Sequence, residues 1–532
     1  MDEAGLFDDG AIELTTSDGI DTGFSHGTRV AERASNRIAW LIDNAQAYEK
    51  LLASLRGARR SVRIAQLAFD SDCAAYSGAS LAATSSRDTV IAESLIHLAT
   101  AYGTEIRILL NASWILNTAR PLRRFFAKRR GAAERIQVRG MARFPHFMHA
   151  KLVLIDGTEA FLLGSPFVNS YWDDGGHIPF DARRPLRELG GRPLHDVSLH
   201  LCGPIVSDLE TMFANVWDAC GETETGAPLP FTRAAMPVAP ARAVGMRVVC
   251  DAPDGMLPGS PNGEMHMLSE FLDGIARARS FIYVEHQYLT SRPIVAALAD
   301  ALRRAPALEI IIVLNQNPDL TAYRAWQNAQ LDEHALLHHP RVGVFTLWST
   351  GADSDRAGVT RLNQLFIHSK VIVVDDEWAV AGTSNLDGVS MGDYGADFAS
   401  ALGRRVFNGV RNVEVNVVIT AGDEIDSEAE AIVTLRERLW SEHLGIARDA
   451  LGVGARGGWL AMWREAARAN VGTLSAEAPY MVGRLLPYSE RPYPRQQLAD
   501  VGVEIDPARL ELCYNPTWFG VHLSPHWIRN IF

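Results

Sequence analysis

The amino-acid sequence predicts an α/β protein built from two similar halves. Short apolar stretches typical of strands alternate with longer helical patterns along most of the chain. Two pairs of these stretches are near-copies of each other. "EIRILLN" (105–111) agrees with "EIIIVLN" (309–315) in five of seven positions, and "FMHAKLVLID" (147–156) returns as "FIHSKVIVVD" (366–375). At 532 residues the chain is also too long for one ordinary hydrophobic core, so we expect a duplicated α/β unit.

The first half is expected at residues 36–225, after a polar N-terminal arm at 1–35. From Arg37 the stretch "IAWLIDNAQAYEKLLASLRGARR" has helical periodicity, which predicts a helix. Three elements are expected after it: a strand at 61–69, a helix near 88–101 and the strand at 105–111.

The second half is expected at residues 246–445, after a Pro- and Ala-rich linker at 226–245. It begins its own series of strands with "SFIYVEHQYL" (280–289), followed by the strand at 309–315. Residues 446–532 are rich in Trp and Pro and have no counterpart in the first half, so we expect a C-terminal extension packed on the second half. Its aromatic end, 514–532, is more typical of packing against the domain than of membrane contact.

Composition narrows the classes of function. The net charge of −12 disfavours a nucleic-acid binder, which normally has a basic surface. No apolar run approaches 18 residues, and the first ten residues lack the apolar core of a secretory signal, so a cytoplasmic or peripheral membrane location is favoured and secretion without such a signal stays open. The five cysteines are scattered: Cys73, Cys202, Cys220, Cys250 and Cys513. They form no CxxC pair, so we expect no zinc, and their odd number gives a mild preference for a reducing compartment. No acidic cluster is evident near the repeated motif, so we expect no metal ion and no cofactor.

Lysine is rare in this chain, and half of the lysines lie in the repeated motif. Only four of the 51 basic residues are lysines, and two of these are Lys151 and Lys370. Side chains alternate between the faces of a strand, so Lys151 should share a face with His149, and Lys370 with His368. A compact ammonium in place of the usual arginine indicates that the site needs a point charge.

The repeated motif offers the groups required for phosphodiester chemistry. One imidazole can attack phosphorus while the other protonates the leaving group, and two ammonium groups can neutralise the phosphate oxygens. Asp156 and Asp375, which close the two motifs, fall on the opposite face at the strand end. We therefore expect these two carboxylates to anchor the strand rather than to contact substrate.

The two H-x-K-x4-D motifs resemble those of the phospholipase D superfamily. "GTSN" (382–385) follows the second motif as the family's G-[ST]-x-N does. Two further segments resemble phospholipid-cleaving members: "PLHDVSLHLCGPIVSDLETMFANVWD" (193–218) and "IYVEHQYL" (282–289). The similarity covers roughly residues 37–490. It implies two phospholipase D-like α/β sandwich halves related by a pseudo-twofold axis, with the active site at their interface.

The resemblance also implies roles for individual residues. His149 would be the nucleophile that forms a phosphohistidine, and His368 the general acid and later the base that activates water. Lys151, Lys370 and Asn385 would hold the phosphoryl oxygens.

Family members use a carboxylate beyond each motif to orient a histidine. Asp196 lies 47 residues after His149, and Glu414 lies 46 residues after His368. Both stand at the start of a strand-like stretch and are the best candidates. Which carboxylate serves which histidine stays open.

The first copy departs from the family pattern after its motif. "GSPFVN" places Pro166 where Asn385 stands in the second copy, and Asn169 could replace it only from a different register. Two further histidines lie near the expected site, His146 and His286, and we expect each either to be structural or to contact a catalytic residue rather than the substrate. Four side chains are candidates for binding substrate: Asn385, Asn169, Ser165 and Thr383.

The resemblance implies a phospholipase D that hydrolyses the head-group phosphodiester of glycerophospholipids, for example phosphatidylcholine to phosphatidic acid and choline. An alcohol in place of water would give transphosphatidylation. The alternatives are a phosphatidyl transferase or nuclease of the same superfamily, and a lipid-binding module with inactive motifs. The expected partner is a phospholipid membrane surface, contacted peripherally by a monomer, with no nucleic acid.

Overall fold

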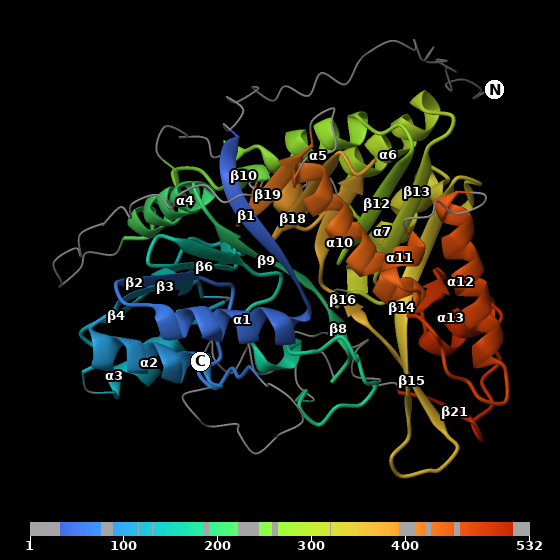
Figure 1. The fold of residues 1–532 in the computed structure, drawn as a ribbon, viewed down its shortest axis with the longest axis horizontal. Helices are drawn as coiled ribbons and strands as arrows, with labels where there is room; N and C mark the ends of the chain where they lie inside the picture. The colour runs from blue at the N-terminus through green and yellow to red at the C-terminus, as the bar shows by residue number, and fades with distance from the viewer. Residues whose placement is uncertain are drawn as a thin grey trace, which may run out of the picture.

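A computed structural model describes most of the chain. The described residues are 32–75, 89–114, 116–129, 131–185, 191–221, 244–257, 264–319, 321–392, 410–421, 427–451 and 458–513. Most of the expected N-terminal arm (1–35) and linker (226–245), and all of the aromatic end (514–532), lie outside these residues. Two large mixed sheets, each with helices against it, form the body of the protein (Figure 1).

Among the described residues, the first sheet contains seven strands, with β6 at its centre. In spatial order they are β1 (Arg33–Ile42), β9 (Val197–Cys202), β7 (Glu159–Leu162), β6 (Leu152–Ile155), β2 (Ser61–Ala65), β3 (Glu105–Asn111) and β4 (Ile136–Met141). β2, β3 and β4 are parallel, and the other neighbours are antiparallel. Three helices share a core with one face of this sheet, namely α1 (Asp43–Gly57), α2 (Ile91–Tyr102) and α3 (Ala119–Ala127).

The second sheet repeats this order of strands and directions. Its corresponding strands are β10 (Val244–Ala252), β19 (Asn412–Thr420), β18 (Trp378–Gly382), β17 (Lys370–Val374), β12 (Phe281–His286), β13 (Glu309–Leu314) and β14 (Val342–Ala352). β11 (Glu264–Met265) pairs with β10. The helices on its outer face are α5 (Met267–Ala276), α6 (Arg292–Arg304) and α7 (Thr321–Glu333). The predicted α/β class is confirmed by this mixed fold, whereas the pseudo-twofold axis stays a prediction.

One hydrophobic core joins the two sheets. It contains Leu154 and Leu199 from the first sheet and Val373 and Val415 from the second. Three helices contribute to the same core: α4 (Ile205–Ala219), α10 (Ser427–Leu444) and α12 (Trp459–Leu474). The two halves therefore face each other across buried apolar side chains, which fixes the position of the strand ends that carry the motifs.

The helix predicted from Arg37 is wrong for its first residues. The chain forms β1 up to Ile42, and only then α1. The reason is an alternation of faces: Trp40 and Ile42 enter the core between the sheets, whereas Leu41 packs under α1. The other early elements agree with the sequence, since α2 spans Ile91–Tyr102 and β3 spans Glu105–Asn111.

The described part of the C-terminal extension adds strands to the second half. β20 (Leu485–Pro487) pairs with β14, and β21 (Leu510–Leu512) pairs with β15 (Thr360–Gln364). Two short helices complete it, α11 (Arg448–Leu451) and α13 (Pro494–Asp500). Among the described residues, no helix combines the length and apolar character that crossing a membrane requires.

Candidate active site

Each motif strand is interrupted at its histidine, contrary to the continuous strand that the pattern predicts. In the first motif, β5 (Phe147–Met148) and β6 are separated by residues 149–151. In the second, β16 (Phe366–Ile367) and β17 are separated by residues 368–369. The interruption arises because the chain changes partner: β6 and β17 pair within their own sheets, whereas β5 and β16 pair with strands of the other half.

The exchanged pairings bring each histidine to the carboxylate of the other half. β5 runs parallel to β19, with Met148 opposite Val413, and the next residues are His149 and Glu414. β16 runs parallel to β8 (Leu194–His195), so that His368 follows beside Asp196. The backbone N–H of His368 donates to the carbonyl of His195 at 2.8 Å.

These pairings assign the two carboxylates that the sequence left open. His149 Nδ1 lies 2.8 Å from Glu414 Oε1, and His368 Nδ1 lies 3.0 Å from Asp196 Oδ2. In both cases the carboxylate binds Nδ1, which leaves Nε2 as the ring nitrogen able to meet a substrate. The site is therefore built from both halves of the chain.

Ser165 and Thr383 were expected to bind substrate directly. In the structure their hydroxyl groups bind these two carboxylates instead. The Ser165 hydroxyl donates to Asp196, and the Thr383 hydroxyl donates to Glu414 at 2.6 Å. The approach is close, since a Cβ at Gly164 would come within 1.9 Å of an Asp196 oxygen. The serine or threonine after the glycine fixes the carboxylate that orients the histidine of the other half.

Both lysines are buried beside the histidines. Lys151 Nζ donates to the carbonyl of His149 at 2.8 Å and lies 3.4 Å from His149 Nε2. Lys370 Nζ donates to the carbonyl of His368 and, at 3.2 Å, to Gln287 Oε1. Asn385 is also buried, and its Oδ1 has no hydrogen-bond partner among the described residues. Lys151, Lys370 and Asn385 thus remain candidates for binding phosphate.

The amide of Asn169 is already occupied. Its Oδ1 accepts from the N–H of Ala74 at 3.1 Å, and its Nδ2 donates to the carbonyl of Asp72 at 3.3 Å. Asn169 would have to give up these bonds to reach a phosphate. The contacts assign it instead to fixing the segment that contains Asp72 and Ala74.

The two motif aspartates, Asp156 and Asp375, bind backbone N–H groups at the far ends of their strands. Each motif aspartate accepts N–H groups at the start of the neighbouring strand, from residues 59–61 for Asp156 and residues 279–281 for Asp375. These bonds anchor the ends of the motif strands.

The two further histidines, His286 and His146, differ in burial. His286 is fully buried opposite Lys370 in the β12–β17 pair, and burial, with Lys370, holds the pKa of its ring well below its usual value. His146 is only half-buried, and burial, with Arg411, lowers the pKa of its ring.

Burial and mutual repulsion set the charges of the site. Burial, with the nearby lysines, lowers the pKa of His149 and brings the pKa of His368 to about 3. Burial also lowers the pKa of Lys151 to about 7, with help from Lys370, and the pKa of Lys370 to about 8. The free site therefore has neutral imidazoles and ammonium groups that titrate near neutral pH.

The carboxylates stay ionised. Burial alone would raise the pKa of Asp196, but His368 and Lys370 outweigh it and lower that pKa. His149 and Lys151 do the same for Glu414. Two carboxylates thus balance two ammonium groups in a buried pocket of the chain.

A second buried charged cluster adjoins the site and could hold a metal ion. Its four donor groups, all within 4.8 Å of one another, belong to Asp43, His177, His195 and Glu442. His177 Nε2 lies 2.8 Å from Glu442 Oε1, and His195 Nδ1 lies 3.1 Å from Asp43 Oδ1. The sequence did not reveal this cluster, because its members lie between positions 43 and 442. Only His195 could have drawn attention to it, since it precedes the candidate carboxylate Asp196.

Several known proteins are similar to this chain in sequence or in fold. Residues 271–432 match the family model described as "Cardiolipin synthase, PLD-like domain". "Phospholipase D" of Phytophthora infestans is 27% identical over 243 residues, which is 38% of this chain and 13% of the relative. "Major cardiolipin synthase ClsA" of Bacillus subtilis (strain 168) is 26% identical over 303 residues, 54% of this chain and 52% of the relative.

In sequence, the chain is therefore similar to members of the phospholipase D superfamily. It spans about half, or less, of the length of these curated relatives. Among solved structures, the phosphatidylserine synthase of Haemophilus influenzae Rd KW20 has the same fold, with a TM-score of 0.50 at 11% identity over 76% of this chain and 86% of that one. The chain thus shares its fold with an enzyme named for a phospholipid.

Proposed function

We propose that this protein is a phospholipase D-type phosphodiesterase that hydrolyses the head-group phosphodiester of glycerophospholipids through a phosphohistidine. The observation that carries the proposal is the crossed arrangement of the two histidines. Each has its Nδ1 bound to a carboxylate from the other half and lies beside a buried lysine. A phosphodiester cleaved in two displacement steps needs such a pair of imidazoles and cationic oxygen ligands.

His149 is the proposed nucleophile. Its side chain is 13% exposed against 4% for His368, and its lowered pKa keeps the ring neutral. Its Nε2 attacks phosphorus, the bond from phosphorus to the head-group oxygen breaks, and His368 gives that oxygen a proton. His368 then takes a proton from water, whose oxygen attacks phosphorus and releases His149.

The low pKa of His368 in the free protein must rise when substrate binds. Lys370 and Lys151 both disfavour its imidazolium form. A phosphodiester carries one negative charge, and binding it between the two ammonium groups offsets that repulsion. The substrate itself thus favours the protonated His368 that the leaving group requires.

Transfer to an alcohol is the second candidate, because relatives of this chain are named cardiolipin synthases. The same phosphohistidine would then be attacked by an alcohol instead of water. The first half of the reaction, and the residues that perform it, would be unchanged.

A product assay separates these candidates. Vesicles of phosphatidylcholine, phosphatidylethanolamine or phosphatidylglycerol are incubated with the protein, with and without EDTA, and free head groups and new diesters are measured. We expect choline and phosphatidic acid from phosphatidylcholine, with EDTA having no effect on the chemical step. New diesters alone would identify a transferase, cleavage of DNA alone a nuclease, and vesicle binding without turnover an inactive binding module.

Two exposed aromatic side chains near the first motif support contact with a phospholipid surface. Trp114 is 70% exposed and Phe144 is 40% exposed, and their ring centroids lie 5.2 Å apart. Both are close in sequence to residues that position His149, since the Asn111 amide binds the backbone N–H and carbonyl of Met148 at 2.8 and 3.0 Å. We propose that the Trp114–Phe144 pair inserts at the membrane surface and that the protein binds it as a monomer.

Trp114→Ala is expected to lower turnover on vesicles about 10-fold, because a removed indole forfeits roughly 1.5–3 kcal/mol of apolar burial. Turnover of a short-chain phospholipid below its critical micelle concentration should stay within a factor of two. The matched control is Tyr480→Ala, which removes another half-exposed aromatic side chain. Equal losses on both substrates would assign Trp114 to the chemistry or to folding instead.

The two lysines predict the pH profile. kcat/KM on monomeric substrate should fall as pH rises from about 7 to 9, because Lys151 and Lys370 lose their protons with pKa values of about 7 and 8. Between pH 7 and about 6, kcat/KM should continue to rise as pH falls, because the leaving group needs a proton on His368 and the pKa of that ring in the free protein is about 3. Lys128→Ala, which removes an exposed lysine, should leave the profile intact. A flat alkaline limb would remove the lysines from substrate binding.

A further inference from the structure

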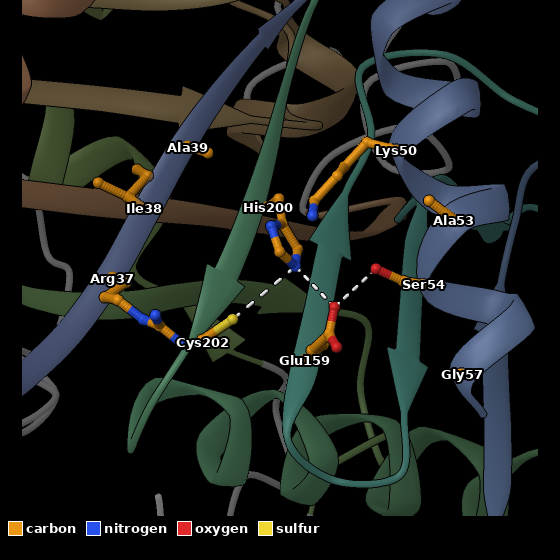
Figure 2. A pocket seen from close by; sticks show the side chains of 10 residues that line it. All are labelled: Arg37, Ile38, Ala39, Lys50, Ala53, Ser54, Gly57, Glu159, His200 and Cys202. Atoms are coloured by element: carbon orange, nitrogen blue, oxygen red, sulfur yellow. Dashed lines mark hydrogen bonds and ion pairs between the residues drawn. The ribbon is translucent and has the colours of Figure 1, made fainter. Parts of the chain in front are cut away.

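A cavity of about 550 Å³ lies on the first half, and none of the proposed catalytic residues lines it. Strands β1, β9 and β7 form one wall and helix α1 the other (Figure 2). Glu159, His200 and Cys202 extend into it from the sheet, and Lys50 and Ser54 from the helix (Figure 2).

Strand register places the three sheet residues together. Glu159 on β7 stands directly opposite Cys202 on β9, and side chains two apart on a strand share a face, so His200 joins them. Phe161 stands opposite His200 and stacks on its ring with centroids 4.5 Å apart. The position of the imidazole is thus fixed by packing.

The carboxylate and the thiol converge on one ring nitrogen. His200 Nε2 lies 2.8 Å from Glu159 Oε2 and 3.8 Å from Cys202 Sγ. A nucleophilic cysteine with a histidine base would need the thiol and the carboxylate on opposite ring nitrogens. Convergence on the same nitrogen is instead the arrangement of three ligands around one metal ion.

Two of the three donor separations fit a tetrahedral ion after small movements, and the third, between Glu159 and Cys202, is within 4.8 Å. With bonds of about 2.0–2.3 Å from zinc to nitrogen, oxygen and sulfur, neighbouring donors should be roughly 3.4–3.6 Å apart. The nitrogen–sulfur separation is close to this, and the nitrogen–oxygen pair must open by about half an ångström. Mixed sulfur, nitrogen and oxygen donors are a set that Zn²⁺ accepts.

We propose that Glu159, His200 and Cys202 form a Zn²⁺ site whose fourth position opens into the cavity. The thiolate and carboxylate together neutralise the dication. Ser54 supports the carboxylate from outside, because its hydroxyl donates to Glu159 Oε2 at 2.7 Å. Arg37 and Lys50 also line the cavity, so the open position faces positive charge and takes water or an anion.

Because the sequence has no CxxC pair, we expected no zinc. That expectation does not apply to this site, which uses a single cysteine. The ligands come from two paired strands, with a single thiol and a spacing of 41 residues between Glu159 and His200. Only the β7–β9 register brings them together.

The test is a metal titration of the full chain after chelator treatment. Co²⁺ is added first, because a cobalt–thiolate bond gives a charge-transfer absorption in the near ultraviolet, and Zn²⁺ is then added to displace it. We expect one equivalent of Co²⁺ to produce the band and one equivalent of Zn²⁺ to abolish it. Cys202→Ser should remove the band and weaken Zn²⁺ binding at least about 10-fold. Cys513→Ser, which removes another partly buried thiol, should change neither.

The band also distinguishes this site from the buried cluster of Asp43, His177, His195 and Glu442. That cluster contains no sulfur, so a metal bound there gives no thiolate absorption. Glu159→Gln preserves the shape of the side chain and should weaken Zn²⁺ binding in a protein whose thermal unfolding is unchanged. Absence of the band in the unaltered chain, or its survival in Cys202→Ser, would overturn the proposal. Head-group release should continue in Cys202→Ser, so failure here leaves the proposed phosphodiesterase unaffected.

Discussion

His149→Ala and His368→Ala are each expected to reduce head-group release by about 10⁴-fold or more, since both displacement steps depend on these imidazoles. The two variants should differ in a rapid-quench experiment with a phosphatidyl ester of p-nitrophenol. That leaving group needs no proton, so His368→Ala should still release one equivalent of nitrophenol and accumulate phosphoenzyme. His149→Ala should show no such burst.

His146→Ala is the matched control, because His146 lies three residues before His149 and is only half-buried. Its turnover should stay within a few-fold of the unaltered protein. A burst in His149→Ala together with none in His368→Ala would mean that the two roles are reversed. Full activity in both variants would dispose of the proposed chemistry altogether.

The sequence drew attention to the proposed reacting groups because the chemistry selects scarce residue types. Lys151 and Lys370 stand out in a chain with four lysines, and each shares its motif with a histidine. The carboxylates were also found, since Asp196 and Glu414 lie at nearly equal distances from the two histidines. All these signals are local or repeated, which is what pattern reasoning can detect.

The exchange of partners between the halves has no local signal. Two-residue strands such as β5 and β16 depend on partners more than 150 residues away, and their pairing interrupts a stretch that reads as one apolar strand. A related limitation explains the helix that was wrongly predicted to begin at Arg37. The apolar–polar alternation at the end of β1 is short, and the longer helical pattern of α1 follows it directly, so the two were interpreted as one helix. Ser165 and Thr383 were expected to bind substrate. Their contacts with Asp196 and Glu414 could not be predicted, because each carboxylate comes from a distant part of the sequence.

Sequence position also could not reveal the two clusters outside the motifs. Glu159, His200 and Cys202 converge through strand register, and Asp43, His177, His195 and Glu442 through the packing of both halves. In each cluster the individual residues look like ordinary solvated or core positions. Their proximity depends on tertiary structure, whereas the H-x-K spacing is written in consecutive residues.

The crossed carboxylates lead to the second large effect. Glu414→Gln should slow formation of the phosphoenzyme by about 10²–10⁴-fold, because an amide can donate to His149 Nδ1 and leave the proton on the attacking nitrogen. Asp196→Asn should impair His368 by a similar factor, since an amide does not stabilise its imidazolium. The nitrophenyl ester separates the two variants. Its burst should be lost in Glu414→Gln and largely retained in Asp196→Asn, although Asp196 belongs to the same half as His149.

Double variants check that each carboxylate acts through the histidine of the other half. Adding Glu414→Gln to His149→Ala should cost little further activity, because the group it positions is already absent, and Asp196→Asn should behave likewise with His368→Ala. Thermal unfolding of each variant separates positioning from loss of structure, since Glu414 also accepts hydrogen bonds from Thr383, at 2.6 Å, and from Ser390 and Asn412. If Glu414→Gln instead reproduced the behaviour of His368→Ala, the carboxylates would serve the histidines of their own halves. The exchange of β5 and β16 between the sheets would then have no part in the chemistry.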